Sequence, residues 1–294
     1  MNKNCTVVKK TLLQKFFWHF RNEDKPFSWM MSRVLFYSGF GRFFTINCGK
    51  YSIRFFPSGI SLAKWSNPKY NINDENILSS LLAPGDVFID VGANVGTLSL
   101  TAASLVGEGG KVYCFEPNRR IFDYLCKNIR LNSFANVIPS NCVVGEKPGE
   151  VFFSDQSHDD INKVVSAGSH KLPMTTIDAI AEQISGNIKL LKIDVEGYEK
   201  FVLQGSENTL CRIDNIYFEA FDEHFTPYGY TTSNILNYLG DFGFSFFRFD
   251  EDGREVAISC KFEATICMNI LAKRQGLRHE AESVESCQNG QNHQ

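Results

Sequence analysis

The chain has 294 residues and a mass of 33.3 kDa, with 43% hydrophobic and 21% charged residues. These values are ordinary for a soluble globular protein, so they exclude a fibrous or wholly disordered chain. The formal net charge of −3 divides unevenly: residues 1–55 hold ten Lys and Arg against two acids, and residues 56–294 hold twenty against thirty-one. Because the larger part is acidic, we expect no nucleic acid partner bound along its phosphate backbone.

The cysteines and the apolar runs indicate the compartment. Nine cysteines are scattered along the chain without a C-x-x-C pair, so neither a zinc cage nor a disulfide framework is indicated. No apolar run has the length of a membrane span, and the N-terminus has too broken an apolar core for a secretory signal. We therefore expect reduced thiols and a cytoplasmic location.

The N-terminal residues 1–74 form a basic, aromatic-rich extension of small α+β type. Residues 11–20 predict a basic amphipathic helix, with Leu12, Leu13, Phe16, Phe17 and Phe20 on one face. Such a helix packs on its own domain or makes a peripheral membrane contact with anionic lipid, and the sequence leaves both open. Residues 43–65 predict short strands interrupted by a turn at residues 57–59.

From residue 75 to residue 274 the pattern predicts a second and larger domain. A short helix closed by Pro84 and Gly85 is followed by apolar strands that alternate with helices. This alternation predicts a mostly parallel sheet with helices on both faces. An insertion with a strand at each end divides the alternation, and two strands meeting at Asp252 and Gly253 predict an antiparallel edge. Residues 275–294 are polar and predict a disordered tail.

The stretch "FIDVGANVGTLSL" places Asp90, Gly92, Asn94 and Gly96 where a strand becomes a helix. In an open α/β sheet, this loop contributes to the ligand crevice at the carboxyl ends of the strands. The two glycines allow a tight turn and a close approach of a ligand to the backbone. The third glycine of a dinucleotide fingerprint is missing, and an acid at the strand end favours a ligand that bears an ammonium group.

The next strand ends in Glu116, about twenty residues after the glycine turn, where an acid can accept hydrogen bonds from ribose hydroxyls. Together, Asp90 and Glu116 favour S-adenosylmethionine over a dinucleotide. The alternatives are that Asp90 caps the following helix and that Glu116 is a solvated acid. The residues expected at the cofactor are Asp90, Gly92, Ala93, Asn94, Gly96, Glu116, Pro117, Asn141 and Cys142, the last two near the adenine edge.

The runs "PGDVFIDVGANVGTLSL", "VYCFEPN", "TTIDAI" and above all "LLKIDVEGYE" resemble the FkbM-type methyltransferases, a branch of the S-adenosylmethionine-dependent class I methyltransferases. The resemblance covers about residues 75–220. It implies a seven-stranded Rossmann-like sheet and O-methylation of sugars or sugar-like metabolites. It also implies that Asp90, Gly92, Asn94 and Gly96 form the cofactor loop, that Glu116 is the ribose acid, and that Asp194 and Glu196 are signature acids.

Asp194 and Glu196 close the fourth strand at the same rim as Asp90, and alternation along an extended backbone places both side chains on one side. Methyl transfer to an alcohol requires loss of the hydroxyl proton, so we expect either acid to be the catalytic base. Alternatively, Asp194 caps the next helix and Glu196 binds amides of the turn. A metal held by this pair is disfavoured, because the spacing shows no third ligand.

Other candidates have less support from the sequence. His158, with Asp159 and Asp160 in the insertion, could contact the acceptor or have no role. His224 follows the fifth strand and faces either substrate or solvent. The aromatic and acidic residues of "YFEAFDEHFTPYGY" suit sugar recognition and equally suit a core.

The sequence thus predicts an O-methyltransferase with a small-molecule or saccharide acceptor. Two alternatives remain open: a non-catalytic protein that keeps the cofactor fold as a binding scaffold, and an NAD-dependent oxidoreductase.

Overall fold

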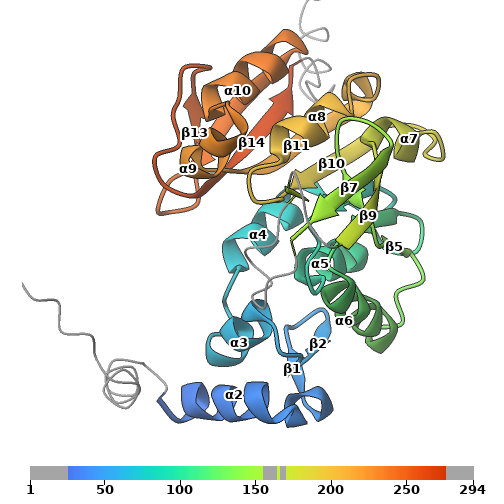
Figure 1. The fold of residues 1–294 in the computed structure, drawn as a ribbon, viewed down its shortest axis with the longest axis vertical. Helices are drawn as coiled ribbons and strands as arrows, with labels where there is room; N and C mark the ends of the chain where they lie inside the picture. Colours follow the sequence, from blue (N-terminus) through green and yellow to red (C-terminus); the bar gives the residue numbers. More distant parts are fainter. Residues whose placement is uncertain (1–25, 155–163, 166–169, 276–294) are drawn as a thin grey trace, which may run out of the picture.

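The computed structural model describes residues 26–154, 164–165 and 170–275. The predicted helix over residues 11–20 and the residues His158, Asp159 and Asp160 lie outside the described residues, as does the polar tail from residue 276. Figure 1 shows helix α2 (Pro26–Ser38) at one end of the molecule and, at the other end, the C-terminal strands, which form one edge of the large sheet.

One large sheet organises the fold. Its eight strands follow the order β13-β12-β14-β11-β10-β3-β4-β5. The five strands from β11 to β5 are parallel, and β14, β12 and β13 are antiparallel to their neighbours. The strand bounds are β3 (Val87–Val91), β4 (Lys111–Phe115), β5 (Val137–Ser140), β10 (Ile188–Ile193), β11 (Ile213–Ala220), β12 (Phe244–Phe249), β13 (Glu255–Ile258) and β14 (Met268–Arg274).

The expected Rossmann-like architecture is confirmed, and the expected seven strands gain an eighth at the antiparallel edge. Strand β13 pairs with β12 through the turn that contains Asp252 and Gly253, as predicted. Strand β14 then inserts between β12 and β11. The parallel strands are apolar at consecutive positions because helices cover both of their faces.

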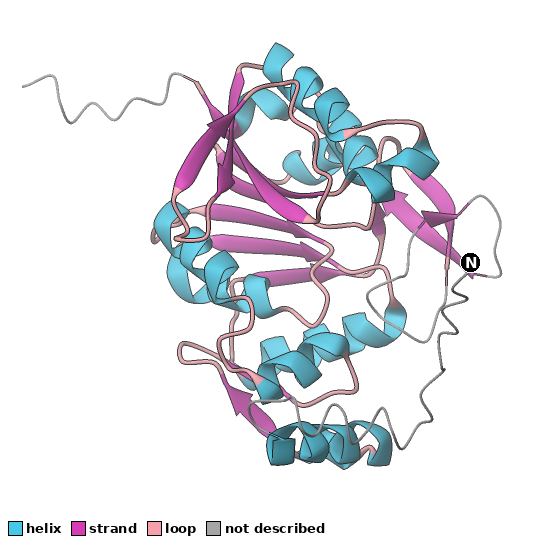
Figure 2. Ribbon diagram, turned by 90° about the vertical axis from the view of Figure 1, so that its left-hand side faces the viewer, coloured by secondary structure: helices cyan, strands magenta, loops and turns pink. Residues whose placement is uncertain are grey.

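Successive residues of the strands point to opposite faces, and each face has its own core. Ile89 of β3 packs with α7 (Ile177–Ala181), α8 (Glu199–Gln204) and α10 (Thr232–Asp241). Phe88 packs with α4 (Ile72–Leu81), α5 (Thr97–Val106) and α6 (Arg119–Leu131) on the other face. Figure 2 shows the sheet between these two helical layers. Shorter helical segments precede and follow β11: η3 (Leu210–Arg212), α9 (Asp222–Phe225) and η4 (Thr226–Tyr228).

The insertion between β5 and α7 forms a small second sheet. Its strands are β6 (Val143–Val144), β7 (Gly149–Phe153), β8 (Val164–Val165) and β9 (His170–Thr175), in the order β6-β9-β7-β8. The strands expected at both ends of the insertion correspond to β7 and β9. Tyr198, which follows β10, donates a hydrogen bond to Glu146 at 2.9 Å and so ties this sheet to the main one.

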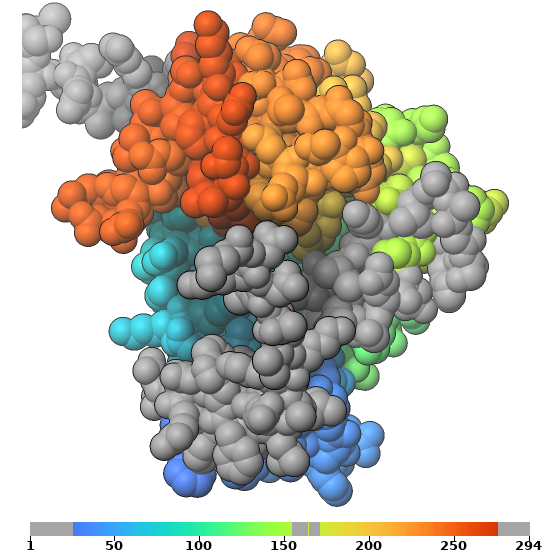
Figure 3. Space-filling model, turned by 60° about the vertical axis from the view of Figure 1, so that its left-hand side comes forward, coloured from blue at the N-terminus to red at the C-terminus, as the bar shows by residue number. Residues whose placement is uncertain are grey.

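The N-terminal residues pack against the domain that follows them. Their elements are α2 (Pro26–Ser38), η1 (Phe40–Phe43), β1 (Thr45–Asn47), β2 (Ser52–Arg54) and α3 (Gly59–Ser66). Asn132 and Asn128 of the α6 region accept hydrogen bonds from the backbone N–H groups of Ser52 and Arg54. Figure 3 shows this segment in blue, at the opposite end from the orange and red C-terminal elements.

One prediction for this region is wrong. Residues 59–66 form helix α3, whereas short strands were expected up to residue 65. The side chain of Ser58 accepts a hydrogen bond from the backbone N–H of Ser61, so the supposed turn is the N-cap of a helix. Within the described residues, no helix combines the length and apolar character needed to cross a membrane.

Candidate active site

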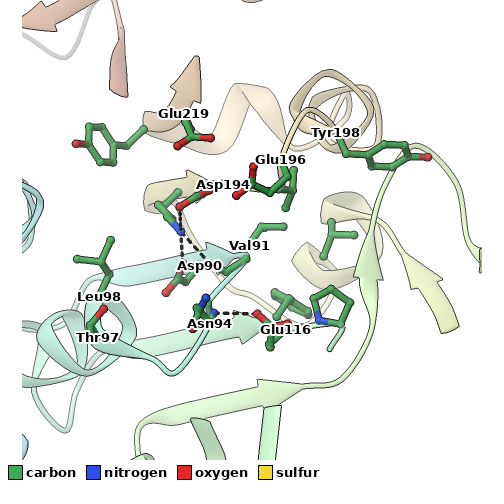
Figure 4. Close-up of a pocket in the computed structure, with 18 of the residues that line it drawn as sticks. Asp90, Val91, Asn94, Thr97, Leu98, Glu116, Asp194, Glu196, Tyr198 and Glu219 are labelled. Carbon is green, nitrogen blue, oxygen red and sulfur yellow. Dashed lines mark hydrogen bonds and ion pairs between the residues drawn. The ribbon is translucent and has the colours of Figure 1, made fainter. Parts of the chain in front are cut away.

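A cavity of about 350 Å³ lies at the carboxyl ends of β3, β4, β10 and β11. Figure 4 shows Asp194, Glu196 and Glu219 along one side of it, with Asn94 and Glu116 opposite. Of the residues expected at the cofactor, the following line it: Asp90, Gly92, Ala93, Asn94, Glu116, Pro117 and Cys142. Its position confirms the expectation that the strand ends of this sheet frame a ligand crevice.

The glycine loop after β3 turns tightly, but both glycines are required by packing within the protein. Gly92 has φ +81° and Gly96 has φ +95°, values that other residues rarely adopt. A Cβ at Gly92 would overlap the carbonyl oxygen of Asp194, and one at Gly96 would lie 2.5 Å from Leu125. Gly92 lines the cavity, so close approach of a ligand there stays a prediction, whereas Gly96 does not line it.

Asp90 is buried, and its charge is matched within the protein. Ser99 of α5 donates a hydrogen bond to Asp90 Oδ2 at 2.5 Å, and Lys192 Nζ lies 3.4 Å from Oδ1. Burial lowers the pKa of Lys192, but Asp194 and Asp90 outweigh burial and raise it above the ordinary lysine value. The preference of Asp90 for a ligand with an ammonium group stays a prediction, and in the structure Lys192 already offsets part of the charge of this carboxylate. The capping alternative is also wrong, because Gly96 is the N-cap of α5.

Glu116 connects the two loops that follow β3 and β4. Its Oε2 accepts a hydrogen bond from the backbone N–H of Asn94 at 2.9 Å, and its Oε1 accepts one from Asn118 at 2.8 Å. The side chain is buried, so it is not the solvated acid of the alternative. A carboxylate has about four acceptor positions, so Glu116 can hold the loops and a ribose diol together.

Apolar side chains line the cavity beyond Glu116, where the insertion meets the sheet. They are Phe115, Cys142, Val143, Val144, Phe153 and Val164. Burial raises the pKa of Cys142 to about 11, so this thiol is neutral at pH 7. Asn141 does not line the cavity, and its amide donates to the carbonyl oxygens of Glu116 and Pro117 at 2.8 Å. Asn141 therefore shapes the loop, and this part of the cavity wall is apolar.

The signature acids lie in a turn. Strand β10 ends at Ile193, and Glu196 has φ +54°, so the expected alternation along an extended backbone does not apply. Asp194 Oδ2 lies 3.2 Å from Lys192 Nζ. Glu196 Oε2 lies 3.3 Å from His224 Nδ1. Asp194 does not cap α8, whose N-cap is Tyr198. Both acids nevertheless line the cavity, as expected from their position at the rim.

Several residues at the site were not identified from the sequence. Lys192 is the strand partner of Asp90 in the parallel register, so its role depends on the pairing of β3 with β10. Asp74 of α4 accepts hydrogen bonds from Tyr217 at 2.6 Å and from Asn269 at 3.1 Å. Glu219 lines the cavity, and burial raises its pKa. The sequence leaves open whether His224 faces substrate or solvent, and in the structure this side chain lies beside Glu196 and Glu219.

A strand order of 5-4-3-10-11-14-12, a glycine loop after β3 and an acid after β4 define a class I methyltransferase domain. The model of the methyltransferase FkbM domain matches residues 90–246. The chain belongs to the FkbM methyltransferase family, which confirms the resemblance and the class of S-adenosylmethionine-dependent methyltransferases.

Two curated relatives resemble parts of the chain. The hexuronic acid methyltransferase AglP of Haloferax volcanii is 32% identical over 139 residues, which cover 46% of this chain and 55% of that protein. The second relative, from Sulfolobus acidocaldarius, is named Probable cobalt-precorrin-6B C(15)-methyltransferase (decarboxylating). It is 32% identical over 118 residues, which cover 40% of this chain and 58% of that protein. The chain therefore spans little more than half the length of these two relatives.

Solved structures show a weaker likeness. The methyltransferase FkbM of Methylobacillus flagellatus KT is 14% identical, with a TM-score of 0.43 over 74% of this chain and 55% of that chain. A SAM dependent methyltransferase of Aquifex aeolicus is 16% identical, with a TM-score of 0.39 over 71% of this chain and 95% of that chain. Values this low carry no conclusion about substrate.

The residues present fit S-adenosylmethionine, the methyl donor of this class. Glu116 would accept hydrogen bonds from the ribose hydroxyls, and the apolar lining that includes Cys142 and Val143 would contact the adenine. Asp194 is 41% exposed at its side chain and would attract the positive sulfonium of the donor, although it shares its charge with Lys192.

Proposed function

We propose that the protein transfers a methyl group from S-adenosylmethionine to a hydroxyl of a saccharide or glycosylated metabolite. The observation that carries this proposal is that carboxylates from two adjacent strand ends, Asp194 after β10 and Glu219 on β11, line the cavity that also contains Glu116. The family provides the class of reaction. The cytoplasmic location expected from the sequence remains part of the proposal.

The acceptor side of the cavity supports a polyhydroxylated substrate. It is lined by Tyr70, Asn71, Asp74, Tyr217 and Asn269, which are polar or aromatic and come from α4, its approach, β11 and β14. Carboxylate, amide and phenol groups bind sugar hydroxyls, and aromatic rings pack on the apolar faces of sugars. The curated relative AglP, a hexuronic acid methyltransferase by name, is consistent with this class of acceptor.

Asp194 is the preferred base of the two signature acids. Its side chain is 41% exposed at the cavity, whereas that of Glu196 is 28% exposed and faces His224. The bound donor supplies an electrophilic methyl group attached to a positive sulfur. Asp194 would accept the hydroxyl proton as the acceptor oxygen bonds to the methyl carbon. Lys192 fixes one of its oxygens and thus its direction.

A methyl-transfer assay tests the proposal. The full chain is incubated with S-adenosylmethionine and a panel of hexuronic acids, neutral hexoses and their glycosides, and the methylated products are identified by mass spectrometry. We expect S-adenosylhomocysteine to form only with a hydroxylated acceptor. We expect Asp194→Asn to lower kcat by about 10²- to 10⁴-fold, with little change in the affinity for S-adenosylhomocysteine.

Asp214→Asn is the matched control. Asp214 also pairs with a lysine of β10, Lys189 at 3.3 Å, but it lies at the start of β11, away from the carboxyl ends of the strands and the cavity. An unchanged kcat in Asp194→Asn would exclude Asp194 as the base. Saturable binding of NAD(H) without binding of S-adenosylmethionine would favour the oxidoreductase alternative. Cofactor binding without transfer to any acceptor would favour the binding scaffold.

A further inference from the structure

Three potential metal ligands from different elements converge beside the cavity. His224 Nδ1, in α9, lies 3.3 Å from Glu196 Oε2 and 3.8 Å from Glu219 Oε2. One ligand atom from each of the three residues lies within 4.8 Å of the others. Two ligands of a zinc-sized ion, each at about 2.1 Å, lie about 3 to 3.5 Å apart. The three side chains therefore need only small shifts to share one cation.

The backbone holds these ligands in place without a cation. Gly197, next to Glu196, has φ +99°, and a Cβ there would overlap the carbonyl oxygen of His224. The turn after β10 is thus in direct contact with α9. Tyr230 donates a hydrogen bond to the Gly197 carbonyl at 2.6 Å. The thiol of Cys267 donates to Glu219 Oε1 at 3.0 Å, which leaves Oε2 directed toward His224. Contacts that hold the ligand side chains in position are typical of metal sites in proteins.

The charge of the cavity gives an independent reason for a cationic ligand. Among the described residues that line it, six carry carboxylates and Lys192 alone carries an amine or guanidine. The carboxylates are those of Asp74, Asp90, Glu116, Asp194, Glu196 and Glu219. S-adenosylmethionine has a formal charge of only +1, so the donor and Lys192 together supply fewer positive charges than there are carboxyl groups. Burial raises the pKa of Asp74 and Glu219, which shows that their charged forms lack compensation in the protein alone. Like charges this close oppose one another, and a dication relieves the repulsion.

We propose that Glu196, Glu219 and His224 bind a divalent metal ion. This site differs from a metal held by Asp194 and Glu196, which the spacing in the sequence disfavours. Two carboxylate oxygens and one imidazole nitrogen suit Mn²⁺ or Zn²⁺. Asp194 is not one of the three ligands, and its Oδ2 pairs with Lys192. With three protein ligands, the ion keeps positions open for water and for an acceptor oxygen.

The role of the ion rests on the proposed function. Bound to the acceptor hydroxyl, it acts as a Lewis acid and makes the oxygen more acidic. The hydroxyl proton passes to Asp194, and the oxygen forms a bond to the methyl carbon. The carbon–sulfur bond of the donor breaks, and its electron pair stays on sulfur, which becomes a neutral thioether. The metal undergoes no change of oxidation state.

Titration with Mn²⁺, followed by the electron paramagnetic resonance signal of the free aqueous ion, tests the site without any substrate. We expect the chelator-treated full chain to bind one Mn²⁺. We expect Glu219→Gln and His224→Gln each to raise the Kd at least tenfold. Glu223→Gln is the matched control, since this exposed residue is next to His224 in the same helix. Circular dichroism and the affinity for S-adenosylhomocysteine report whether each variant is folded.

The inference is overturned if the wild-type chain binds no Mn²⁺, or if both variants are folded and bind it as well as the wild type does. A protonated His224 hydrogen-bonded to Glu196 would then explain the geometry. Methyl transfer that persists unchanged after chelation overturns the role of the ion and leaves the proposed function intact. Mn²⁺ binding that depends on Glu219 and His224, without methyl transfer to any saccharide, supports the site and contradicts the proposed function.

Discussion

The backbone N–H of Val195 donates a hydrogen bond to Glu199 Oε1 at 2.9 Å, inside the turn that carries Asp194 and Glu196. Glu199 is completely buried, and its Oε2 accepts no hydrogen bond within the described residues. The last acid of "KIDVEGYE" is therefore a structural residue that fixes the turn. Burial raises the pKa of Glu199 to about 8, with smaller contributions from Asp194 and Glu219.

This pKa predicts a pH dependence of stability. The ordinary pKa of a glutamate is 4.5, so between pH 4.5 and 8 the folded protein binds more protons at Glu199 than the unfolded chain does. The free energy of unfolding must then fall as pH rises through this window, by up to about 1.4 kcal/mol per pH unit for this one group. Glu199→Gln removes the titration. Urea unfolding at several pH values should show the variant gaining stability relative to the wild type from pH 5 to 8.

Glu207→Gln is the control for this prediction, because Glu207 is exposed and lies just beyond α8. Its stability should change with pH as the wild type's does. If Glu199→Gln has the same pH slope as the wild type, Glu199 does not carry its proton in the folded protein at neutral pH.

A second prediction concerns the cation between Asp90 and Asp194. Lys192 is 6% exposed, and Lys192→Met leaves two carboxylates without their partner. Removal of one member of a buried ion pair costs about 3 to 5 kcal/mol. We expect a loss of this size in urea unfolding, and partial recovery in Lys192→Met/Asp90→Asn.

Lys189→Met is the matched control on the same strand. Lys189 is 33% exposed at its side chain and pairs with Asp214, so its loss should cost about 1 kcal/mol or less. If both lysine variants lose the same free energy of unfolding, the buried ion pair of Lys192 stabilises the protein no more than the partly exposed pair of Lys189 does.

Much of the fold follows from local patterns. Strands such as β3 and β10 are apolar at consecutive positions, and each is followed by a helical period, so the parallel sheet could be predicted. Helix α3 could not, because Pro57, Ser58 and Gly59 are equally typical of a turn and of a helix start. The hairpin of β12 and β13 could be predicted from the turn at Asp252 and Gly253, but the place of β14 between β12 and β11 could not, because no local pattern encodes the order of strands.

The site was predictable only where its residues are close in sequence. The loop around Gly92 and the acid at Glu116 belong to local motifs. The pairing of Lys192 with Asp90 depends on the register of two strands about a hundred residues apart. The contact of Asp74 with Tyr217 joins residues 143 positions apart. No periodicity encodes such contacts, so the charge balance of the cavity could not be derived from the motifs alone.

The packing of Gly92 against the turn after β10 predicts an unusually costly alanine substitution. Gly92→Ala must adopt φ +81° and also place a Cβ against the Asp194 carbonyl. The two effects together should reduce the free energy of unfolding by about 2 to 5 kcal/mol. Gly229→Ala is the control, since φ is +77° there and no atom lies within 4 Å of the added Cβ. It should lose only about 1 kcal/mol. If urea unfolding shows the same loss of free energy of unfolding in both variants, the loop after β3 and the turn after β10 can move apart at little cost.

Replacement of Glu116 tests the prediction that this acid binds the ribose of the methyl donor. Glu116→Gln removes the negative charge. It also replaces one carboxylate oxygen with an NH₂ group, so the backbone N–H of either Asn94 or Asn118 loses its acceptor. A hydrogen bond to a charged group is worth about 1.5 to 3 kcal/mol. The Kd for S-adenosylhomocysteine, measured by calorimetry, should therefore rise about 10- to 100-fold. Glu108→Gln, at an exposed position after α5, should leave it unchanged. If Glu116→Gln binds as tightly as the wild type, the ribose hydroxyls contact a different residue, and the assignment of the acid after β4 is wrong.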